Sequence, residues 1–369
     1  MNVSNSLEVI QQFHRRKFTG PENYAAVSKA ARQAYQTLSK DEVEFLVLMA
    51  LTDDKNLQNI LACLACLNPG CLKDFHQTLI EQEAFNPSEI YFEANHDVTS
   101  ILIRLVTKSN EMMQRSCLLS CLAWAGNGYV QKQFSDWKQS PPEWVSMLYV
   151  PPHQYTYQAG WELLSNGTRQ DLFFETTLPL VIPEEAPCSN DSVQTGIPAE
   201  QHCPWCERQL VSLLELDLTS DELAFLNLVG KSLRFTTCDV CACYGTLFSK
   251  VDRQGNSSWH AANTRPGYLP DDTSDWGAFP IKPLVLSGQE RHFMESADWC
   301  SLPAINFSQV GGLPSWIQDD SYPDCPECSR KMKFVSQISN EDYEKSMEGI
   351  YYLLLCCDCN VTATVYQQS

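Results

Sequence analysis

The first 150 residues follow a helical pattern of apolar and polar positions. Apolar side chains recur at helical spacing over stretches of about 10 to 15 residues, as in amphipathic helices. Polar turns such as Asn68-Pro-Gly and Gly126-Asn-Gly separate these stretches. Ser39 and Glu42 form a capping-box pattern directly before an apolar run. The pattern predicts helices over 23–38, 43–49, 57–67, 72–85, 98–106, 112–125 and 129–137.

The pattern changes after two proline pairs, Pro141-Pro and Pro151-Pro. From Tyr155 onward the apolar runs are short and bounded by turn residues, which favours β-strands. Residues 184–201 are rich in Ser, Pro and acids and are expected to form a linker or exposed loop, and 251–300 is loop-rich. Strands are predicted at 172–178, 244–248, 283–286, 332–338, 351–355 and 361–366.

These two patterns predict an α+β protein with two domains. Residues 1–150 are expected to form a helical domain, because short turns between consecutive helices favour antiparallel pairs that stack as a HEAT-like solenoid. Residues 151–369 are expected to form a β-rich domain.

The β-rich half repeats one cysteine arrangement. Two Cys-x-x-Cys turns, here called knuckles, stand 31 residues apart in the first set and 27 residues apart in the second. Four thiolates on two such turns suit one tetrahedral Zn²⁺ with no open coordination position. The spacing therefore predicts two structural Zn²⁺ sites in zinc ribbons at about 200–250 and 320–365. The expected ligands are Cys203, Cys206, Cys238 and Cys241 in the first site, and Cys325, Cys328, Cys356 and Cys359 in the second.

Three neighbouring residues leave alternatives open. Cys243 could replace Cys241, and Cys357 could replace Cys356. The knuckle pairing is favoured because it keeps the same two-residue gap in all four turns. His202 borders the first knuckle and is expected to be an exposed neighbour rather than a ligand.

The remaining cysteines and histidines give little sign of chemistry. Cys63, Cys66 and Cys71 lie in an apolar helical stretch and are expected to pack in the core, as are Cys117 and Cys121. The sequence has no nucleophile elbow, P-loop, H-E-x-x-H motif or dinucleotide fingerprint. His260 and His292 could pair with Cys300, but loop histidines are usually structural or exposed. The chain is therefore predicted not to be an enzyme, with no catalytic residues.

The formal charge of −19 is unevenly distributed. Residues 1–150 hold 13 Lys or Arg against 16 Asp or Glu, whereas 151–369 hold 13 against 29, so the net charges are −3 and −16. Two Zn(Cys)₄ sites would add −2 each and bring the chain to −23. Such a charge disfavours nucleic-acid binding and favours a basic partner, although it could also serve solubility alone.

Two segments combine carboxylates with tryptophan, as in contacts with basic partners. For either segment alone, a solvated turn with its tryptophan folded inward is the favoured interpretation. The candidate partner-binding residues are Asp271, Asp272, Asp275, Trp276, Trp316, Asp319 and Asp320.

The amino-terminal residues lack a cationic segment leading into an apolar core, and no apolar run approaches the roughly 18 residues that span a bilayer. The 17 cysteines among 369 residues fall below the density of a secreted disulfide scaffold. The sequence thus predicts a cytoplasmic protein with no membrane partner.

One segment carries a family resemblance. The run Val310-Gly-Gly-Leu-Pro-Ser-Trp-Ile-Gln, the Cys325 knuckle, Met332-Lys-Phe-Val-Ser-Gln-Ile and Tyr351-Tyr-Leu-Leu-Leu-Cys resemble the bacterial YwqG-like family. The chain resembles, more distantly, the eukaryotic programmed-cell-death-two family. The match covers about 60 residues well and 160–369 loosely. The glycine pair predicts a tight turn that needs positive φ or a close backbone approach.

The resemblance implies a binding role, because YwqG-like proteins include zinc-carrying variants and proteins encoded beside toxins of interbacterial secretion systems. The leading hypothesis is an immunity protein that binds a cognate bacterial toxin and occludes its active site. A basic nuclease effector is favoured as the toxin, since an acidic surface can occupy a site built for phosphates. A scaffold or chaperone-like adaptor is the first alternative, and a hydrolase with an unrecognised site is the second.

Overall fold

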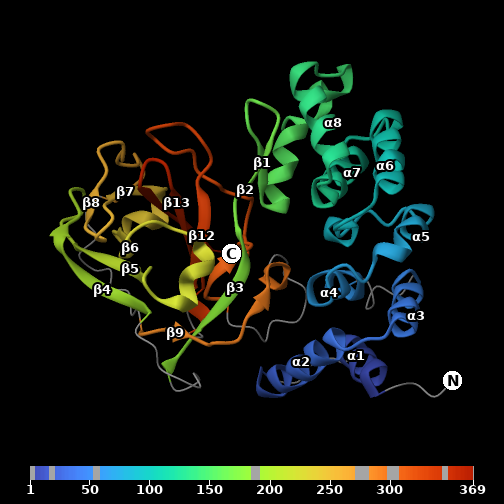
Figure 1. Cartoon of the computed structure of the whole chain (residues 1–369), viewed down its shortest axis with the longest axis horizontal. Helices are drawn as coiled ribbons and strands as arrows, with labels where there is room; N and C mark the ends of the chain where they lie inside the picture. The colour runs from blue at the N-terminus through green and yellow to red at the C-terminus, as the bar shows by residue number, and fades with distance from the viewer. Residues whose placement is uncertain are drawn as a thin grey trace. The chain divides into compact units, whose positions relative to one another are not determined.

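The computed structural model describes residues 5–15, 21–52, 59–183, 192–270, 282–296, 307–342 and 348–368. The chain divides into two compact units, one formed by Met1–Asp171 with Met294–Ile305 and the other by Leu172–Phe293 with Asn306–Ser369. Helices dominate the first unit and sheets the second, so the predicted α+β class is confirmed (Figure 1). The sequence-based boundary at 150 lies inside the first unit, before a small hairpin that this unit includes.

The helices of the first unit are α1 Asn5–Arg15, α2 Pro21–Gln36, α3 Lys40–Ala50, α4 Asn59–Leu67, α5 His76–Glu81, α6 His96–Lys108, α7 Met112–Ala125 and α8 Gly128–Gln139. Six helices of the first unit lie close to predicted ones, whereas α1 was not predicted and α5 is shorter than its prediction. The predicted capping box is present, because the backbone N–H and the hydroxyl of Ser39 both donate to the Glu42 carboxylate at 2.7 Å.

The prediction of one continuous helix over 72–85 is wrong. The segment forms a short 3₁₀ turn before α5, and α5 ends at Glu81. Glu83 adopts a left-handed conformation with φ 53°, which lets the Ala84 N–H donate to the Leu79 carbonyl at 2.9 Å. That C-terminal motif stops the helix in spite of the helical pattern that continues along the sequence.

A small hairpin packs on α7 in the same unit. Its strands are β1 Trp161–Leu163 and β2 Arg169–Asp171. Trp161 is fully buried, and its indole N–H donates to the Ala123 carbonyl on α7 at 2.9 Å. The 3₁₀ elements among the described residues are η2 Lys73–Phe75, η3 Ser88–Tyr91, η4 Glu143–Met147, η5 Pro152–Ala159, η7 Asp221–Leu226, η8 Cys241–Tyr244, η9 Phe293–Ser296 and η10 Asn340–Asp342.

Two antiparallel sheets form the second unit. Over the described residues, the larger sheet has nine strands in the order β10-β3-β11-β12-β13-β14-β7-β8, with β9 beside β3, and the smaller has the order β4-β5-β6. The strands are β3 Phe174–Val181, β4 Val193–His202, β5 Gln209–Asp217, β6 Ser232–Thr237, β7 Leu247–Val251, β8 Ser257–Trp259, β9 Val285–Leu286, β10 Arg291–His292, β11 Gln309–Gly312, β12 Lys333–Ser339, β13 Ile350–Cys356 and β14 Val361–Gln367.

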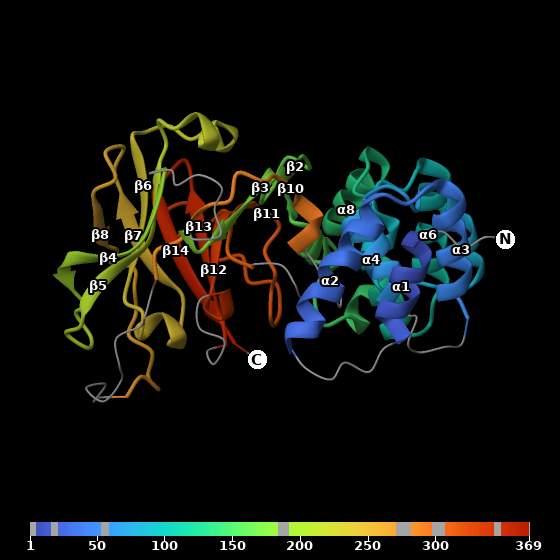
Figure 2. The ribbon, with the colours of Figure 1, turned by 90° about the horizontal axis from the view of Figure 1, so that it is seen from below.

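The smaller sheet covers one end of the larger one, with an apolar core between them (Figure 2). Leu214 and Phe235 of the small sheet and Leu353 of β13 belong to this core and are fully buried. Every residue of β13 is buried, as expected for the continuous apolar run of a strand that lies inside its sheet.

The small sheet corrects the sequence-based interpretation of 184–201. Residues 193–201 form part of β4 and are not a linker, whereas 184–191 lie outside the described residues. Beyond its first residue, β4 is half-buried or exposed, because it is an edge strand that pairs only with β5. A polar edge strand carries no apolar alternation by which sequence patterning could find it.

The predicted glycine turn is present where β11 meets β3. Gly311 and Gly312 have φ of 75° and 73°, and the register between β11 and β3 shifts at this point. A Cβ on Gly311 would lie 2.1 Å from the Thr176 carbonyl oxygen. Both the backbone conformation and the close approach therefore require glycine.

Buried amides anchor the segment after this turn. Gln309 Nε2 donates to the carbonyls of Gly311 and Leu313 at 2.9 Å each. Gln337 Nε2 donates to the Phe307 carbonyl at 2.7 Å, and Gln337 Oε1 accepts from the Ser315 N–H at 2.9 Å. The glycine pair and Gln337, both in the segment that resembles the YwqG-like family, thus fix the conformation of the loop after β11.

Candidate metal centres

Eight cysteines form two groups of four in the second unit. Within each group the sulfur atoms all lie within 4.8 Å of one another. The groups contain the residues expected from the sequence, namely Cys203, Cys206, Cys238 and Cys241 in the first centre, and Cys325, Cys328, Cys356 and Cys359 in the second. Both groups are geometrically suited to hold a metal ion.

In the first centre, one knuckle connects β4 to β5 and the other follows β6. The Sγ–Sγ distances are 3.7 Å for Cys203–Cys241, 3.5 Å for Cys206–Cys238 and 3.7 Å for Cys206–Cys241. Four sulfurs at roughly 2.3 Å from a tetrahedral metal would be about 3.8 Å apart. The spacing fits a shared ion and is far longer than the roughly 2.05 Å of a disulfide.

The second centre repeats this construction on the large sheet. Its first knuckle precedes β12, and its second knuckle forms the turn between β13 and β14. Cys328 Sγ lies 3.6 Å from Cys356 Sγ. Strand pairing of β13 with β14 continues to Cys356, so the sheet itself positions this ligand.

The first knuckles of the two centres share one backbone pattern. The Cys203 N–H donates to the Arg208 carbonyl at 2.7 Å, and the Cys325 N–H donates to the Arg330 carbonyl at 2.8 Å. The residue after each second cysteine is left-handed, with φ 60° at Glu207 and φ 57° at Ser329. This repetition in backbone detail supports an internal duplication of the module.

Each centre pairs an arginine of one knuckle with an aspartate of the other. Arg208 Nη2 lies 3.6 Å from Asp239 Oδ2 in the first centre. Arg330 pairs with Asp358 in the second. Sequence reasoning missed both arginines, although each stands five positions after the first cysteine of its set. These pairs cross-link the two knuckles of each centre independently of the sulfurs.

The electrostatic surroundings favour thiolates at specific positions. The backbone N–H of Arg330 is the main cause that lowers the pKa of Cys328 to about 6, and the Arg330 guanidinium acts in the same direction. In the first centre, hydrogen bonds from the Cys238 and Cys241 thiols lower the pKa of Cys203. A metal ion binds the thiolate form, so the effect on Cys328 favours binding, whereas the hydrogen bond that lowers the pKa of Cys203 raises the pKa of Cys238.

Two side chains connect the centres to each other. Lys250 on β7 donates to both oxygens of Glu327, at 2.7 and 2.8 Å, and to the Cys359 carbonyl at 2.6 Å. This lysine lowers the pKa of Glu327, which lies inside the Cys325 knuckle. Tyr351 on β13 donates to the Asp239 carbonyl of the first centre at 3.1 Å. The strand that follows the first centre thus contacts the second.

The two cysteine groups include one member of each alternative pair. Cys241 and Cys356 belong to the two groups, whereas Cys243 and Cys357 are exposed and lie outside them. The Cys243 thiol donates to the Asp239 carbonyl at 3.4 Å. His202 is exposed and is not part of the first group, in agreement with the sequence-based expectation.

The other sequence-based candidates lie in different settings. Trp316 is half-buried, with its ring 4.2 Å from that of Tyr352 and 5.3 Å from that of Tyr322 between centroids. Asp319 is exposed, whereas Asp320 is half-buried and burial raises its pKa. The remaining candidates, Asp271, Asp272, Asp275 and Trp276, lie outside the described residues.

The cysteines expected in the core are largely buried. Cys63, Cys66 and Cys121 are fully buried, and Cys71 and Cys117 are partly buried. Among the described residues, none of these five belongs to a metal-ligating group. His260 lies 3.4 Å from Glu327, His292 forms part of β10, and Cys300 lies outside the described residues.

A comparison with known proteins supplies the family. The protein named uncharacterized protein YpfL in Salmonella typhimurium is 33% identical over 379 residues, which cover 100% of this chain and 87% of that protein. The chain belongs to the YpfL family. No family model matches the chain, and no solved structure matches it. Within the described residues, no helix is both long and apolar enough to cross a membrane.

Proposed function

We propose that each Cys₄ group binds one Zn²⁺ as a closed structural centre in a zinc ribbon. The sulfur separations of 3.5 to 3.7 Å support this assignment, because they match a tetrahedral ion with four thiolate ligands. The bound ion would cross-link two turns that are distant in sequence. All four coordination positions are filled by protein, so the centres stabilise the unit and leave no position for a substrate.

Four thiolate ligands in a tetrahedron can bind either zinc or iron, and spectroscopy identifies which metal is bound. X-ray absorption at the zinc edge of the purified chain should show four sulfur neighbours at about 2.3 Å. A mixed shell with nitrogen or oxygen would remove at least one cysteine from the ligand set, and an iron edge in place of zinc would overturn the assignment.

We further propose that the protein acts by binding another protein rather than by catalysis. The observation that supports this is the net charge of −16 over residues 151–369, most of which belong to the unit with the two cysteine groups. An acidic surface on a rigid unit attracts basic partners and repels phosphate backbones. The leading specific hypothesis is an immunity protein that occludes the active site of a cognate bacterial toxin, with a basic nuclease favoured.

A second candidate, a scaffold or chaperone-like adaptor, rests on the helical unit. Consecutive helices contact one another as the pairs α1/α2, α3/α4 and α6/α7. Such pairs are the building blocks of HEAT-like solenoids, which offer extended binding surfaces. Under this hypothesis the helical unit carries the partner, and the acidic unit serves solubility.

Genetic neighbourhood and binding kinetics separate the two hypotheses. Co-expression with a toxin encoded beside this gene should restore growth and yield a stable complex if the chain is an immunity protein. Association should slow as salt rises, because screening shortens to about 8 Å at 0.15 M. Asp271→Asn, Asp272→Asn and Asp275→Asn should slow association, with Lys132→Gln in the helical unit as a control. An on-rate indifferent to salt and to these changes would contradict the acidic-surface mechanism.

A further inference from the structure

The β7–β8 hairpin contacts both metal centres. Its strands pair antiparallel, with Ser249 opposite Trp259. Strand β7 begins six residues after Cys241 of the first centre. The same strand pairs with β14, which begins two residues after Cys359 of the second centre (Figure 2). The hairpin is therefore joined to the first centre through the chain and to the second centre through strand pairing.

Strand β8 contacts the first centre through a pair of tryptophans. The Trp259 ring lies 5.0 Å from the Trp205 ring between centroids, with an angle of 88° between the two planes. Trp205 is the third residue of the Cys203 knuckle, and both tryptophans are half-buried. Gln201 Nε2, near the end of β4, donates to the Ser257 carbonyl of β8 at 2.9 Å. The position of β8 thus depends on how the first knuckle is held.

The residue that follows β8 contacts the second centre. His260 Nε2 donates to Glu327 Oε1 at 3.4 Å, because the Ala262 N–H donates to the ring Nδ1 at 3.1 Å and leaves the ring proton on Nε2. Lys250 on β7 donates to the same carboxylate and to the Cys359 carbonyl. This glutamate is the third residue of its knuckle, the position that a tryptophan holds in the first centre. Adjacent residues at the end of the hairpin thus contact equivalent positions of the two centres.

A bound ion would change how firmly these contacts are held. Four thiolate ligands fix the two turns of a centre relative to each other, whereas turns without an ion are joined only by weaker contacts. With the first centre filled, Trp205 and the start of β7 are fixed, so Lys250 and His260 already lie against the second knuckle. Binding of the second ion then orders fewer groups, and its affinity is higher.

We propose that the β7–β8 hairpin couples the two centres, so that Zn²⁺ in one centre raises the affinity of the other centre for Zn²⁺. This inference rests on the Zn²⁺ binding proposed above. Thermodynamic linkage makes the effect reciprocal, because each ion must raise the affinity for the other by the same factor. We expect a factor of about ten, which is within the usual range for two linked sites. Chains with only one filled centre are therefore disfavoured.

Chelator titration of the zinc-loaded, full-length chain measures this coupling. Cys206→Ser removes the first centre through its half-buried ligand, and Cys328→Ser removes the second centre. Each variant should retain one ion and so give the association constant of the remaining centre alone. The product of the two association constants in the native chain should exceed the product of the two single-centre constants about tenfold.

Lys250→Gln tests whether the hairpin carries the coupling. With this change in the native chain and in both single-centre variants, the ratio should fall from about ten to about two, because the contacts with Glu327 and the Cys359 carbonyl are lost. A ratio that came only from general destabilisation by the cysteine changes would stay at about ten. Lys231→Gln is the matched control and should leave the ratio unchanged, because it removes an exposed cation of the same unit outside both centres.

The outcomes separate the coupling from the metal binding on which it rests. Two bound ions with a ratio of one would show that the centres bind independently and would overturn the coupling alone. A ratio that is unchanged in Lys250→Gln, or that falls equally in Lys231→Gln, would overturn the role of the hairpin. A native chain that binds no Zn²⁺ would overturn the proposed metal centres themselves.

Discussion

The two metal centres share one local design but lie in different surroundings. Cys203, Cys238 and Cys241 of the first centre are buried and belong to the apolar core of the unit. Its fourth ligand, Cys206, is half-buried, whereas in the second centre two ligands are half-buried, Cys328 and Cys359. The same Cys-x-x-Cys spacing thus serves once mainly within the apolar core and once at the ends of interior strands of the large sheet. Local sequence sets the ligand geometry, whereas the surrounding strands set how much stability depends on each ion.

Loss of a buried ligand should have the largest effect. Cys238→Ser leaves a buried hydroxyl in the core and removes the first ion, so the β-rich unit should lose about 5 kcal/mol or more of stability. Cys328→Ser should cost less, because this ligand is half-buried and lies outside the apolar core. Hydrogen exchange of peptides from β5, β6, β12 and β13 measures both losses locally.

Cys243→Ser provides the matched control, since Cys243 is exposed and belongs to neither group. It should keep the full metal content and the exchange protection of the native chain. Unchanged hydrogen-exchange protection in Cys238→Ser would show that the first centre does not stabilise the apolar core.

The second-largest expected effect is a difference between the two centres in the rate of metal release. A chelator reaches half-buried ligands more easily than buried ones, and the second centre has two of them against one in the first, so the second ion should leave roughly tenfold faster. Release followed with a colorimetric zinc indicator should be biphasic, and Cys328→Ser should abolish the fast phase. A single phase for the native chain would contradict the difference in burial as the controlling factor.

Loss of the arginine–aspartate pair should also cost more stability in the first centre than in the second, but the difference should be smaller than for the cysteine ligands. Arg208→Gln leaves Asp239, which is 7% exposed, without its cation and should cost on the order of 3 kcal/mol. Arg330→Gln affects a more exposed pair and should cost less than about 1 kcal/mol. Chemical denaturation measures the free energy of unfolding of both variants. A larger loss in Arg330→Gln than in Arg208→Gln would contradict the proposed difference between the two centres.

The lysine link between the centres should have the smallest effect. Lys250→Gln removes the contacts with Glu327 and the Cys359 carbonyl, so it should speed release of the second ion by no more than about fivefold. The first ion should be unaffected. The acceleration should shrink at high salt, because Lys250 and Glu327 are partly exposed. Equal acceleration of both ions would indicate general destabilisation of the unit instead.

The grouping of the eight cysteines was predictable because it depends on local spacing. A two-residue gap places both thiols of a knuckle on one turn, and this rule favours Cys241 over Cys243 and Cys356 over Cys357, in agreement with the two observed groups. Long helical periodicity likewise predicted α7 at its observed bounds. The mixed α+β class followed from the change of pattern near residue 150.

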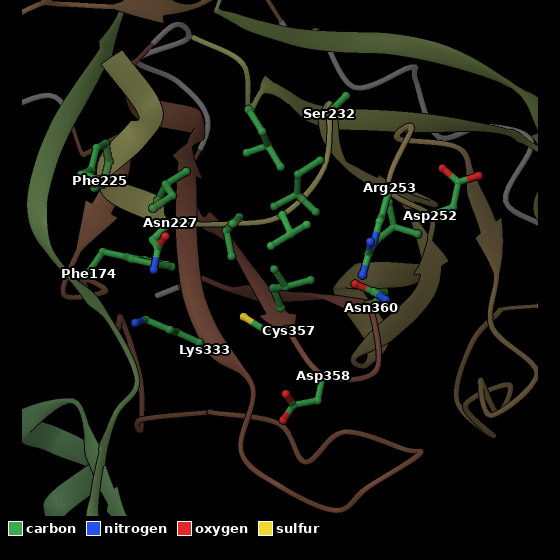
Figure 3. Close-up of a pocket in the computed structure, with 17 residues that line it drawn as sticks. Phe174, Phe225, Asn227, Ser232, Asp252, Arg253, Lys333, Cys357, Asp358 and Asn360 are labelled. Atoms are coloured by element: carbon green, nitrogen blue, oxygen red, sulfur yellow. The ribbon is translucent and has the colours of Figure 1, made fainter. Parts of the chain in front are cut away.

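The features that sequence reasoning missed depend on contacts between distant segments. Strand β4 is polar because it is a sheet edge, and only its pairing with β5 reveals it. The partners Lys250 and Glu327 are 77 residues apart, so no local pattern connects them. A cavity in the second unit likewise depends on distant segments, since Phe225, Arg253 and Lys333 line it from three separate parts of the chain (Figure 3).

Metal content of the purified full-length chain tests the central claim most directly. Elemental analysis against protein concentration should give about two zinc ions per chain, falling to about one in Cys238→Ser and in Cys328→Ser. One zinc ion in the native chain, or iron in place of zinc, would contradict the account of two structural Zn(Cys)₄ centres.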